Sequence, residues 1–185
     1  SVDIGGALFK IEDDGPTAQD SDVAALTAVT VDESALPEVG DGDRSATLDA
    51  SAAFADANFG TDGQGSIDFA LVLEGTDVAT GLTNLDGTAI VLNQDAVTGL
   101  VTGSADGIDY FTLSLDADTG EVVFTQLNNI AHGDTTNPDD IASLNIAAGD
   151  LTVERTVTDA DGDFVTESVD IGGALFKIED DGPTA

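Results

Sequence analysis

The chain has 185 residues, of which 41% are apolar, so it can bury the core of a domain and is not a disordered acidic tail. Its 37 acidic and 4 basic residues give a net charge of −33, which makes nucleic acid and anionic membranes poor partners because both repel it. It has no cysteine for disulfides or thiolate metal sites, and no apolar run of the ~18 residues that a membrane span needs.

The acidic residues are mostly aspartate, with 29 Asp against 8 Glu. Aspartate is typical of turns and is a hard oxygen ligand, and a strongly negative protein attracts divalent cations. Since no disulfide can stabilise the chain, we expect Ca²⁺ to be its stabilising cofactor.

The first 18 residues occur again, without a change, at residues 168–185, which gives a period of 167 residues. We interpret residues 1–18 as the last strand and junction of a preceding repeat. Residues 19–185 are then one repeat with its outgoing junction, in a unit built to be stacked head to tail. The repeated stretch consists of an apolar strand, three adjacent carboxylates and a Gly-Pro turn.

The first half of the repeat predicts strands separated by turns. Residues 23–31 are rich in Val, Thr and Ala and predict the first strand. The Ala-rich residues 45–59 fit either a strand or a short helix, and we favour the strand. Residues 66–73 are the clearest strand, because apolar and polar side chains alternate along them.

The second half continues this pattern. A glycine-closed loop between two alternating runs predicts a hairpin, and Gly172-Gly173 predicts a bend in the last strand. The predicted strands are residues 89–92, 97–101, 111–115, 122–127, 151–157 and 165–171. About eight short strands with little helical periodicity predict an all-β chain, an antiparallel immunoglobulin-like β-sandwich, which would carry insertions because such domains have about 100 residues.

The loop that begins at Asp159 has carboxylates at alternate positions, Asp159, Asp161 and Asp163. This spacing opens an EF-hand loop, but Phe164 stands where that loop requires glycine, and the flanking segments are strands. Only the chelating pattern carries over, and a solvated hairpin turn explains the spacing equally well. The pairs Asp116/Asp118 and Asp41/Asp43 are weaker candidates and fit turns better.

The topology of an array favours metal binding. The two ends of each repeat must lie at opposite poles, so the Asp159 loop lies near the incoming junction and the end of the first strand lies near the outgoing junction. Uncompensated carboxylates would repel one another there, and bridging Ca²⁺ would remove the repulsion. The candidate metal ligands are Glu12, Asp13, Asp14, Asp159, Asp161 and Asp163 at one pole, and Asp32, Glu33, Glu179, Asp180 and Asp181 at the other.

His132 is the single histidine, and Asp134 follows it closely. A Ser-His-Asp triad is formally conceivable, but the chain has no G-x-S-x-G elbow. H-E-x-x-H, P-loop and G-x-G-x-x-G motifs are absent as well. We therefore expect His132 to be structural and the chain not to be an enzyme.

Several blocks resemble the tandem extender repeats of giant type I secreted RTX adhesins of Gram-negative bacteria. The most specific are TVTDADGD at residues 156–163 and FKIEDDGP at residues 176–183; the others are residues 31–34, 59–63, 110–112 and 124–130 with His132. The resemblance implies an immunoglobulin-like, calcium-binding module, secreted to the bacterial cell surface, that projects a ligand-binding tip for adhesion and biofilm formation.

We therefore expect a monomeric spacer module whose partners are the neighbouring repeats of the same chain. A second hypothesis is a ligand-binding module that recognises a sugar or surface through residues 128–150 or the face around Tyr110, although aromatic residues make up only 5% of the chain. A third is an acidic enzyme fragment from a halophile. Calcium removal should destabilise the spacer, whereas a halophilic protein should respond to bulk salt.

Overall fold

The computed structural model describes residues 14–33, 43–137 and 139–180. Within these ranges the chain forms β-strands and two short 3-10 helices, so the prediction of an all-β chain is confirmed. The elements in order are η1 (Val23–Ala25), β1 (Val29–Asp32), β2 (Ser45–Asp49), η2 (Ala50–Ala53), β3 (Gln64–Leu73), β4 (Val78–Thr83), β5 (Ala89–Gln94), β6 (Val101–Ala105), β7 (Ile108–Leu115), β8 (Glu121–Gln126), β9 (Ile141–Asn145), β10 (Leu151–Asp159), β11 (Phe164–Asp170) and β12 (Gly173–Glu179).

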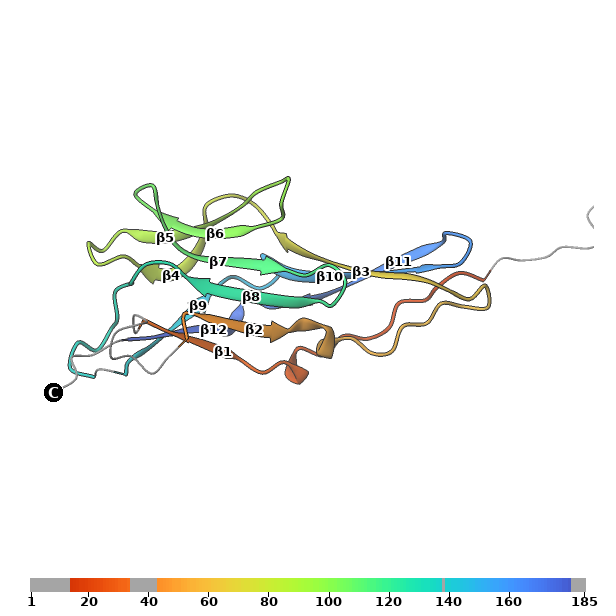
Figure 1. Ribbon diagram of the computed structural model, residues 1–185, viewed down its shortest axis with the longest axis horizontal. Coiled ribbons are helices and arrows are strands. Elements are labelled where there is room, and N and C mark those ends of the chain that lie inside the picture. Colours follow the sequence, from red (N-terminus) through yellow and green to blue (C-terminus); the bar gives the residue numbers. More distant parts are fainter. Residues whose placement is uncertain (1–13, 34–42, 138, 181–185) are drawn as a thin grey trace, which may run out of the picture.

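The strands form three sheets (Figure 1). The largest is an antiparallel sheet in the order β2-β8-β7-β6-β5-β4, which curls into a half-barrel. The second is antiparallel in the order β11-β10-β3. The third, β1-β12-β9, is mixed, because β1 runs parallel to β12 while β9 runs antiparallel to it.

The alternating sequences form the strands that they predict. Along β3, Phe69, Leu71 and Leu73 are buried while the residues between them are exposed or half-buried. The β7–β8 hairpin pairs Leu115 with Val122 across the predicted loop. Alternation is equally regular in β10, where every second side chain is buried.

Three strand predictions need correction. Residues 97–100 do not form a strand, and β6 begins only at Val101. Asp95 accepts hydrogen bonds from the amides of Val97 and Thr98, so a turn forms here, and Val97 is 93% exposed. Within residues 45–59, β2 gives way to the 3-10 turn η2, which buries Ala50 and Ala53. Within residues 23–31, η1 takes the place of the first residues of the predicted strand.

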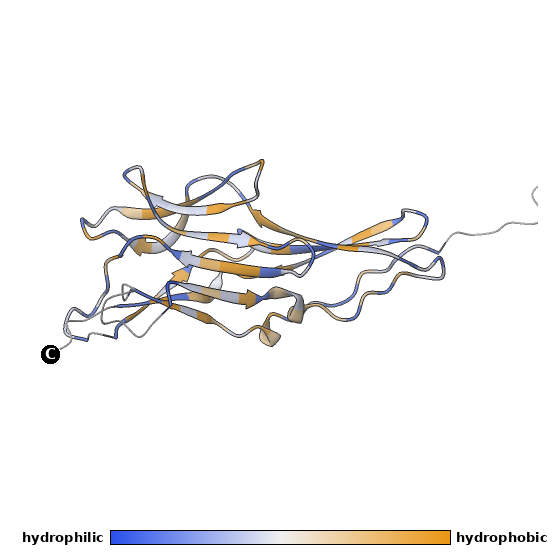
Figure 2. Cartoon of the chain, in the orientation of Figure 1, coloured by the Kyte–Doolittle hydropathy of each residue, from blue (hydrophilic) through white to orange (hydrophobic). Residues whose placement is uncertain are grey.

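One apolar core joins the three sheets. Phe124 of β8 contacts Phe111 of β7 and Phe176 of β12, with ring centroids 5.5 Å and 5.4 Å apart, so these rings connect the six-stranded sheet to the β1-β12-β9 sheet. Figure 2 shows apolar stretches along the strands and hydrophilic colours in many of the connecting loops. Burial of these aromatic rings is the main favourable contribution to folding.

The bend at Gly172-Gly173 moves the chain from one sheet to another. β11 ends at Asp170 in the β11-β10-β3 sheet, and β12 begins at Gly173 in the β1-β12-β9 sheet. The pairing register of β12 with β9 shifts after Gly173, and Ala174 adopts a positive φ of 57°. The predicted bend is therefore confirmed.

The molecule is elongated, and the described chain enters at one end and leaves at the other (Figure 1). The first described residues lie at the end that carries the β10–β11 loop, and β1 and β12 finish at the opposite end. None of the described helices is long and apolar enough to cross a membrane.

Candidate functional site

The predicted metal ligands fall into two groups at opposite ends of the molecule. Asp14, Asp159, Asp161 and Asp163 lie at the end with the β10–β11 loop, and Asp32, Glu33, Glu179 and Asp180 lie at the other. Glu12, Asp13 and Asp181 lie outside the described residues.

The first group is organised by the β10–β11 hairpin. The amide of Asp159 donates to the carbonyl of Asp163 at 2.9 Å, which closes the loop. Oδ1 of Asp159 accepts hydrogen bonds from the amides of Gly162 (3.0 Å) and Asp163 (2.8 Å). The TDADGD sequence therefore forms a tight turn around one fixed carboxylate.

The other oxygen of Asp159 is available to a ligand. Asp159 is 3% exposed, and its Oδ2 is buried with no hydrogen-bond partner in the described ranges of the chain. Carboxylate oxygens of Asp159, Asp161 and Asp62 all lie within 4.8 Å of one another. A buried, unpaired carboxylate oxygen is costly, and a divalent cation bound by the three carboxylates would remove that cost.

The charge of Asp159 is set by opposing effects. Burial raises the pKa of Asp159, but its interactions with Asp161 and the hydrogen bonds from the amides of Gly162 and Asp163 outweigh this, so its pKa lies below the ordinary value. The carboxylate is therefore ionised at neutral pH, as a cation ligand must be.

Asp62 was not among the predicted ligands. It lies in the turn before β3, which pairs with β10 and so brings the turn beside the Asp159 loop. The amide of Ala160 donates to the carbonyl of Gly63 at 3.1 Å and holds the turn and the loop together. The Gly60-Thr61-Asp62-Gly63 sequence is typical of a turn, but only the strand pairing reveals what the turn contacts.

The incoming segment reaches the same end. A Cβ added to Gly15 would lie 3.2 Å from the Cβ of Asp163, so Gly15 packs directly against the loop. Gly60, at a φ of 70°, packs so closely on the backbone of Asp14 that a side chain there would overlap it. Thr17 then pairs with Asn58 in an antiparallel bridge. The predicted proximity of Asp14 to the Asp159 loop is observed.

The second group forms where β1 and β12 end. Asp32 pairs with Glu179 in the parallel ladder, and the amide of Glu33 donates to the carbonyl of Glu179 at 3.0 Å. Glu33 is 2% exposed, and its Oε1 accepts hydrogen bonds from the amide of Ile130 and from Nε2 of Gln126, each at 2.8 Å. Burial raises the pKa of Glu33, an effect that these hydrogen bonds and the imidazole of His132 partly offset.

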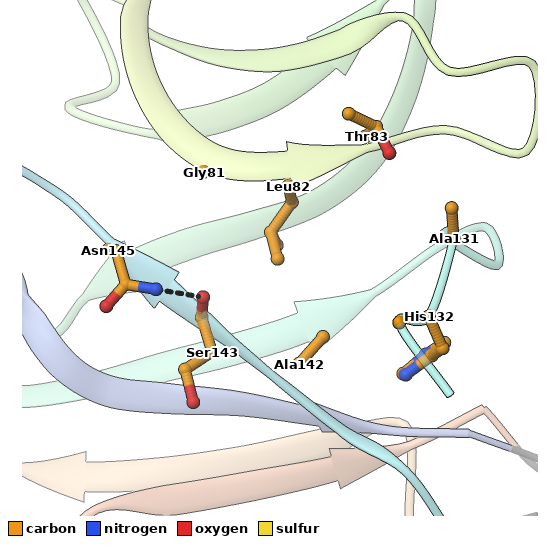
Figure 3. Close-up of a pocket in the computed structure, with 9 residues that line it drawn as sticks. Gly81, Leu82, Thr83, Ala131, His132, Ala142, Ser143 and Asn145 are labelled. Carbon is orange, nitrogen blue, oxygen red and sulfur yellow. Dashed lines mark hydrogen bonds between the residues drawn. The ribbon is translucent and has the colours of Figure 1, made fainter. Parts of the chain in front are cut away.

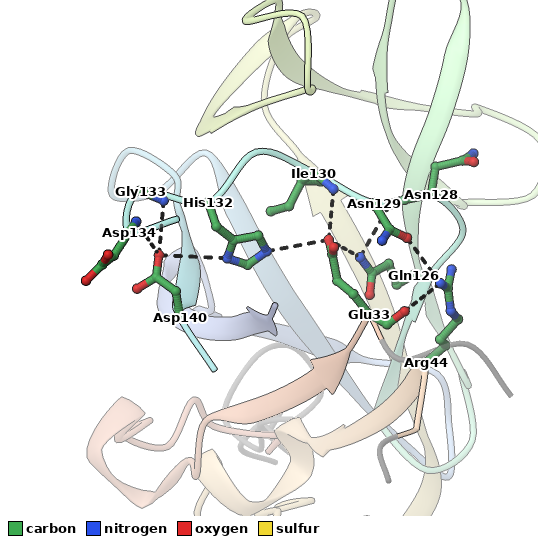
Figure 4. Close-up of polar contacts among 10 residues, drawn as sticks. All are labelled: Glu33, Arg44, Gln126, Asn128, Asn129, Ile130, His132, Gly133, Asp134 and Asp140. Atoms are coloured by element: carbon green, nitrogen blue, oxygen red, sulfur yellow. Dashed lines mark hydrogen bonds and ion pairs between the residues drawn. The ribbon is translucent and has the colours of Figure 1, made fainter. Parts of the chain in front are cut away.

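His132 contacts Glu33, a contact that its polar sequence context did not predict. Its side chain is 3% exposed; Nε2 lies 3.5 Å from Oε1 of Glu33, and Nδ1 lies 4.0 Å from Oδ2 of Asp140 (Figure 4). Both ring nitrogens are buried and have no hydrogen-bond partner among the described residues. Ligand atoms of Glu33, His132 and Asp180 all lie within 4.8 Å of one another.

A pocket of about 340 Å³ lies between β4 and β9 (Figure 3). It is lined by Gly81, Leu82, Thr83, Ala131, His132, Gly133, Ala142, Ser143 and Asn145. Part of the 128–150 connection thus lines a hollow. Tyr110, although only 7% exposed, lines a second pocket of about 390 Å³ together with Leu85, Asp86, Ile108, Asn128 and Asn129.

Comparison with known proteins identifies the family but gives no named relative. No curated protein and no solved structure matches the chain significantly. A domain family of unknown function, DUF5801, matches residues 28–172, which is well over half of the chain. The chain therefore belongs to the DUF5801 family.

Proposed function

We propose that this chain is a calcium-stiffened extender module of a large bacterial surface adhesin, secreted to the cell surface, with an immunoglobulin-like sandwich fold. The observation that carries the proposal is the buried, unpaired Oδ2 of Asp159, which lies beside Asp62 and Asp161. The segment that would connect to the preceding repeat packs on the same loop. A cation there would fix both the loop and the entry of the chain.

The mechanism is mechanical. Ca²⁺ bound at each junction stiffens the connection between neighbouring repeats, so the array projects its tip as a rod for adhesion and biofilm formation. The net charge of −33 keeps such rods soluble and apart. With a Kd near 10⁻⁴ M and about 10 mM calcium, binding to the folded state alone adds about 2.7 kcal/mol to the free energy of unfolding.

The test is thermal unfolding of the chain in EDTA, in excess CaCl₂ and in NaCl of matched ionic strength. Calcium should raise the Tm well above the value in NaCl, and Asp159→Asn should abolish most of that gain. Asp116→Asn is the matched control, because Asp116 caps a similar hairpin loop by accepting from the amides of Asp118 and Thr119. Equal calcium responses of the two variants, or no calcium response of the wild type, would refute the proposal.

Interdomain stiffness is tested on a chain with two copies of the 167-residue period. Small-angle scattering should show a longer and narrower particle in calcium than in EDTA, with little change in Asp159→Asn. An unchanged scattering profile would mean that calcium binds locally without stiffening the junction.

A ligand-binding module is the second candidate, and the pocket between β4 and β9 is the observation that favours it. Soluble glycans that protect the amides of residues 131–133 and 142–145 from hydrogen exchange would support it. A halophilic enzyme fragment is the third, and a Tm that rises with NaCl as steeply as with CaCl₂ would favour it.

A further inference from the structure

We propose that Glu33, His132 and Asp180 form a second, chemically different site, for a zinc-like divalent cation, at the end opposite the Asp159 loop. The site goes beyond the proposed calcium function, because it assigns this end to an ion that binds imidazole. It lies where β1, β12 and the 126–140 connection meet.

The imidazole is the observation that points to a ligand. Its side chain is 3% exposed, and within the part of the chain that the structure describes both nitrogens lack a hydrogen-bond partner, although a carboxylate oxygen lies 3.5 Å from Nε2. Ligands at about 2.0–2.2 Å from a tetrahedral zinc ion lie about 3.3–3.6 Å from one another. The spacing of Nε2 and Oε1 therefore fits two ligands of one ion, whereas a direct hydrogen bond would be shorter.

The surroundings hold these ligands in place. Oε1 of Glu33 is fixed by Gln126 and Ile130, as ligating carboxylates generally are by hydrogen bonds. On the other side of the ring, Asp140 faces Nδ1 at 4.0 Å. A shift of about 1 Å would bring Asp140 to hydrogen-bond distance of Nδ1, where it would orient a metal-binding histidine as such carboxylates do.

Asp140 and Asp180 are themselves tied together. Oδ2 of Asp140 accepts from the amides of Gly133 (3.0 Å) and Asp134 (3.1 Å), so it is held beside the ring (Figure 4). The amide of Asp180 donates to the carbonyl of Asp140 at 2.9 Å. One loop therefore positions both the histidine and the third ligand.

Charge balance also favours a cation. Three carboxylates, those of Glu33, Asp140 and Asp180, surround a single imidazole. The neighbouring Arg44 directs its guanidinium to the carbonyl of Glu33 and to Asn129, not to these carboxylates. A 2+ ion on Glu33, His132 and Asp180 would leave Asp140 facing Nδ1 on the other side of the ring.

The ligand set selects the ion. Ca²⁺ takes six to eight oxygen ligands, whereas one imidazole nitrogen with two carboxylates suits Zn²⁺ with water in the fourth position. The side chains of Asp140 and Asp180 are part-exposed, which leaves a path for the ion to enter.

The test is calorimetric titration of the metal-free chain with ZnCl₂ in excess CaCl₂, which saturates sites made of oxygen alone. We expect one zinc ion per chain. Asp140→Asn removes a residue that supports the histidine and should weaken zinc affinity by about 10–100-fold. His132→Gln and Asp180→Asn each remove a ligand and should weaken zinc affinity by more than that. Co²⁺ should give the intense visible absorption of a tetrahedral site in the wild type and lose it in His132→Gln.

Zinc binding that is unchanged in both His132→Gln and Asp180→Asn would overturn the proposal, as would a wild-type chain without zinc binding. Asp180→Asn keeps the test valid if His132→Gln fails to fold, because a substitution at the part-exposed Asp180 disturbs the core less. The calcium response of His132→Gln should equal that of the wild type, so this site and the calcium function fail independently.

Discussion

Replacing Glu167 with glutamine should destabilise the chain strongly, because it breaks a buried ion pair. Arg155 is 5% exposed and Glu167 is 8% exposed. Nε of Arg155 donates to Oε2 of Glu167 at 2.9 Å, and Nη2 also contacts this oxygen. Nη1 donates to the carbonyl of Ala55 at 2.6 Å, and the guanidinium lies 4.7 Å from the ring centroid of Phe54.

The magnitude follows from what remains after the change. Glutamine keeps the size of the side chain and one acceptor oxygen, but it leaves the guanidinium buried without a counter-charge. Removing one partner of a buried pair costs about 3–5 kcal/mol, and the retained acceptor places Glu167→Gln near 3 kcal/mol. A domain of about 5–15 kcal/mol total stability loses much of its margin by that change.

Urea unfolding of the wild type and Glu167→Gln, followed by fluorescence of the single Tyr110 or by circular dichroism, measures the loss. The double variant Arg155→Met/Glu167→Met should lose less than the single variant, because it buries no unpaired charge. A loss below about 1 kcal/mol in Glu167→Gln, as for an exposed pair, would refute the reasoning.

The same change should loosen the incoming segment. The amide of Gln19 donates to Oε1 of Glu167, and the hydroxyl of Ser21 donates to the carbonyl of Ser168 at 2.9 Å. A neutral acceptor weakens the first of these bonds. The amide of Gln19 should therefore exchange faster in Glu167→Gln, while amides in β7 keep their protection relative to global unfolding.

Two further predictions concern sites away from the clusters. Gly103→Ala places a methyl group against the fully buried ring of Phe111. It should lower the free energy of unfolding in urea by about 1–3 kcal/mol. A variant as stable as the wild type would refute this packing. Hydrogen bonds from the amide and hydroxyl of Thr98 and the amide of Val97 hold the pKa of Asp95 below 3.8. Ionised Asp95 therefore contributes stability above its unfolded pKa, and this contribution is lost as the pH falls through its folded pKa. The difference in unfolding free energy between the wild type and Asp95→Asn should close in acid. A difference that widens in acid would contradict this prediction.

Local alternation was sufficient to find the strands that bury one face. It failed at β4, because Thr80 is buried and donates its hydroxyl to the carbonyl of Ile90 at 2.6 Å, and Gly81 takes a positive φ of 76°. In the sequence, a threonine followed by a glycine is typical of a turn. Only the pairing with β5 shows that this stretch is a strand.

The candidate sites were predictable only where the chain itself brings ligands together. The alternate aspartates of the β10–β11 loop are close in sequence, so their spacing indicates them. His132 and Glu33 are 99 positions apart, and Asp62 and Asp159 are 97 apart. These contacts depend on strand pairing. The polar sequence around His132 indicates an exposed loop, whereas β1 and the 126–140 connection bury the side chain of His132.

The parallel pairing of β1 with β12 explains why acidic residues gather at the outgoing end. The ladder aligns Asp32 with Glu179, so the residues that follow both strands emerge at the same end, where an antiparallel pair would have separated them. Asp180, next along β12, belongs to the proposed zinc site, and its counterpart one period earlier is Asp13. The next residue, Asp14, adjoins Gly15, which packs on the Asp159 loop. In a head-to-tail array the proposed zinc site of one repeat and the proposed calcium site of the next therefore share one acidic run, so either ion restrains the same junction, and removing both should loosen it more than removing either alone.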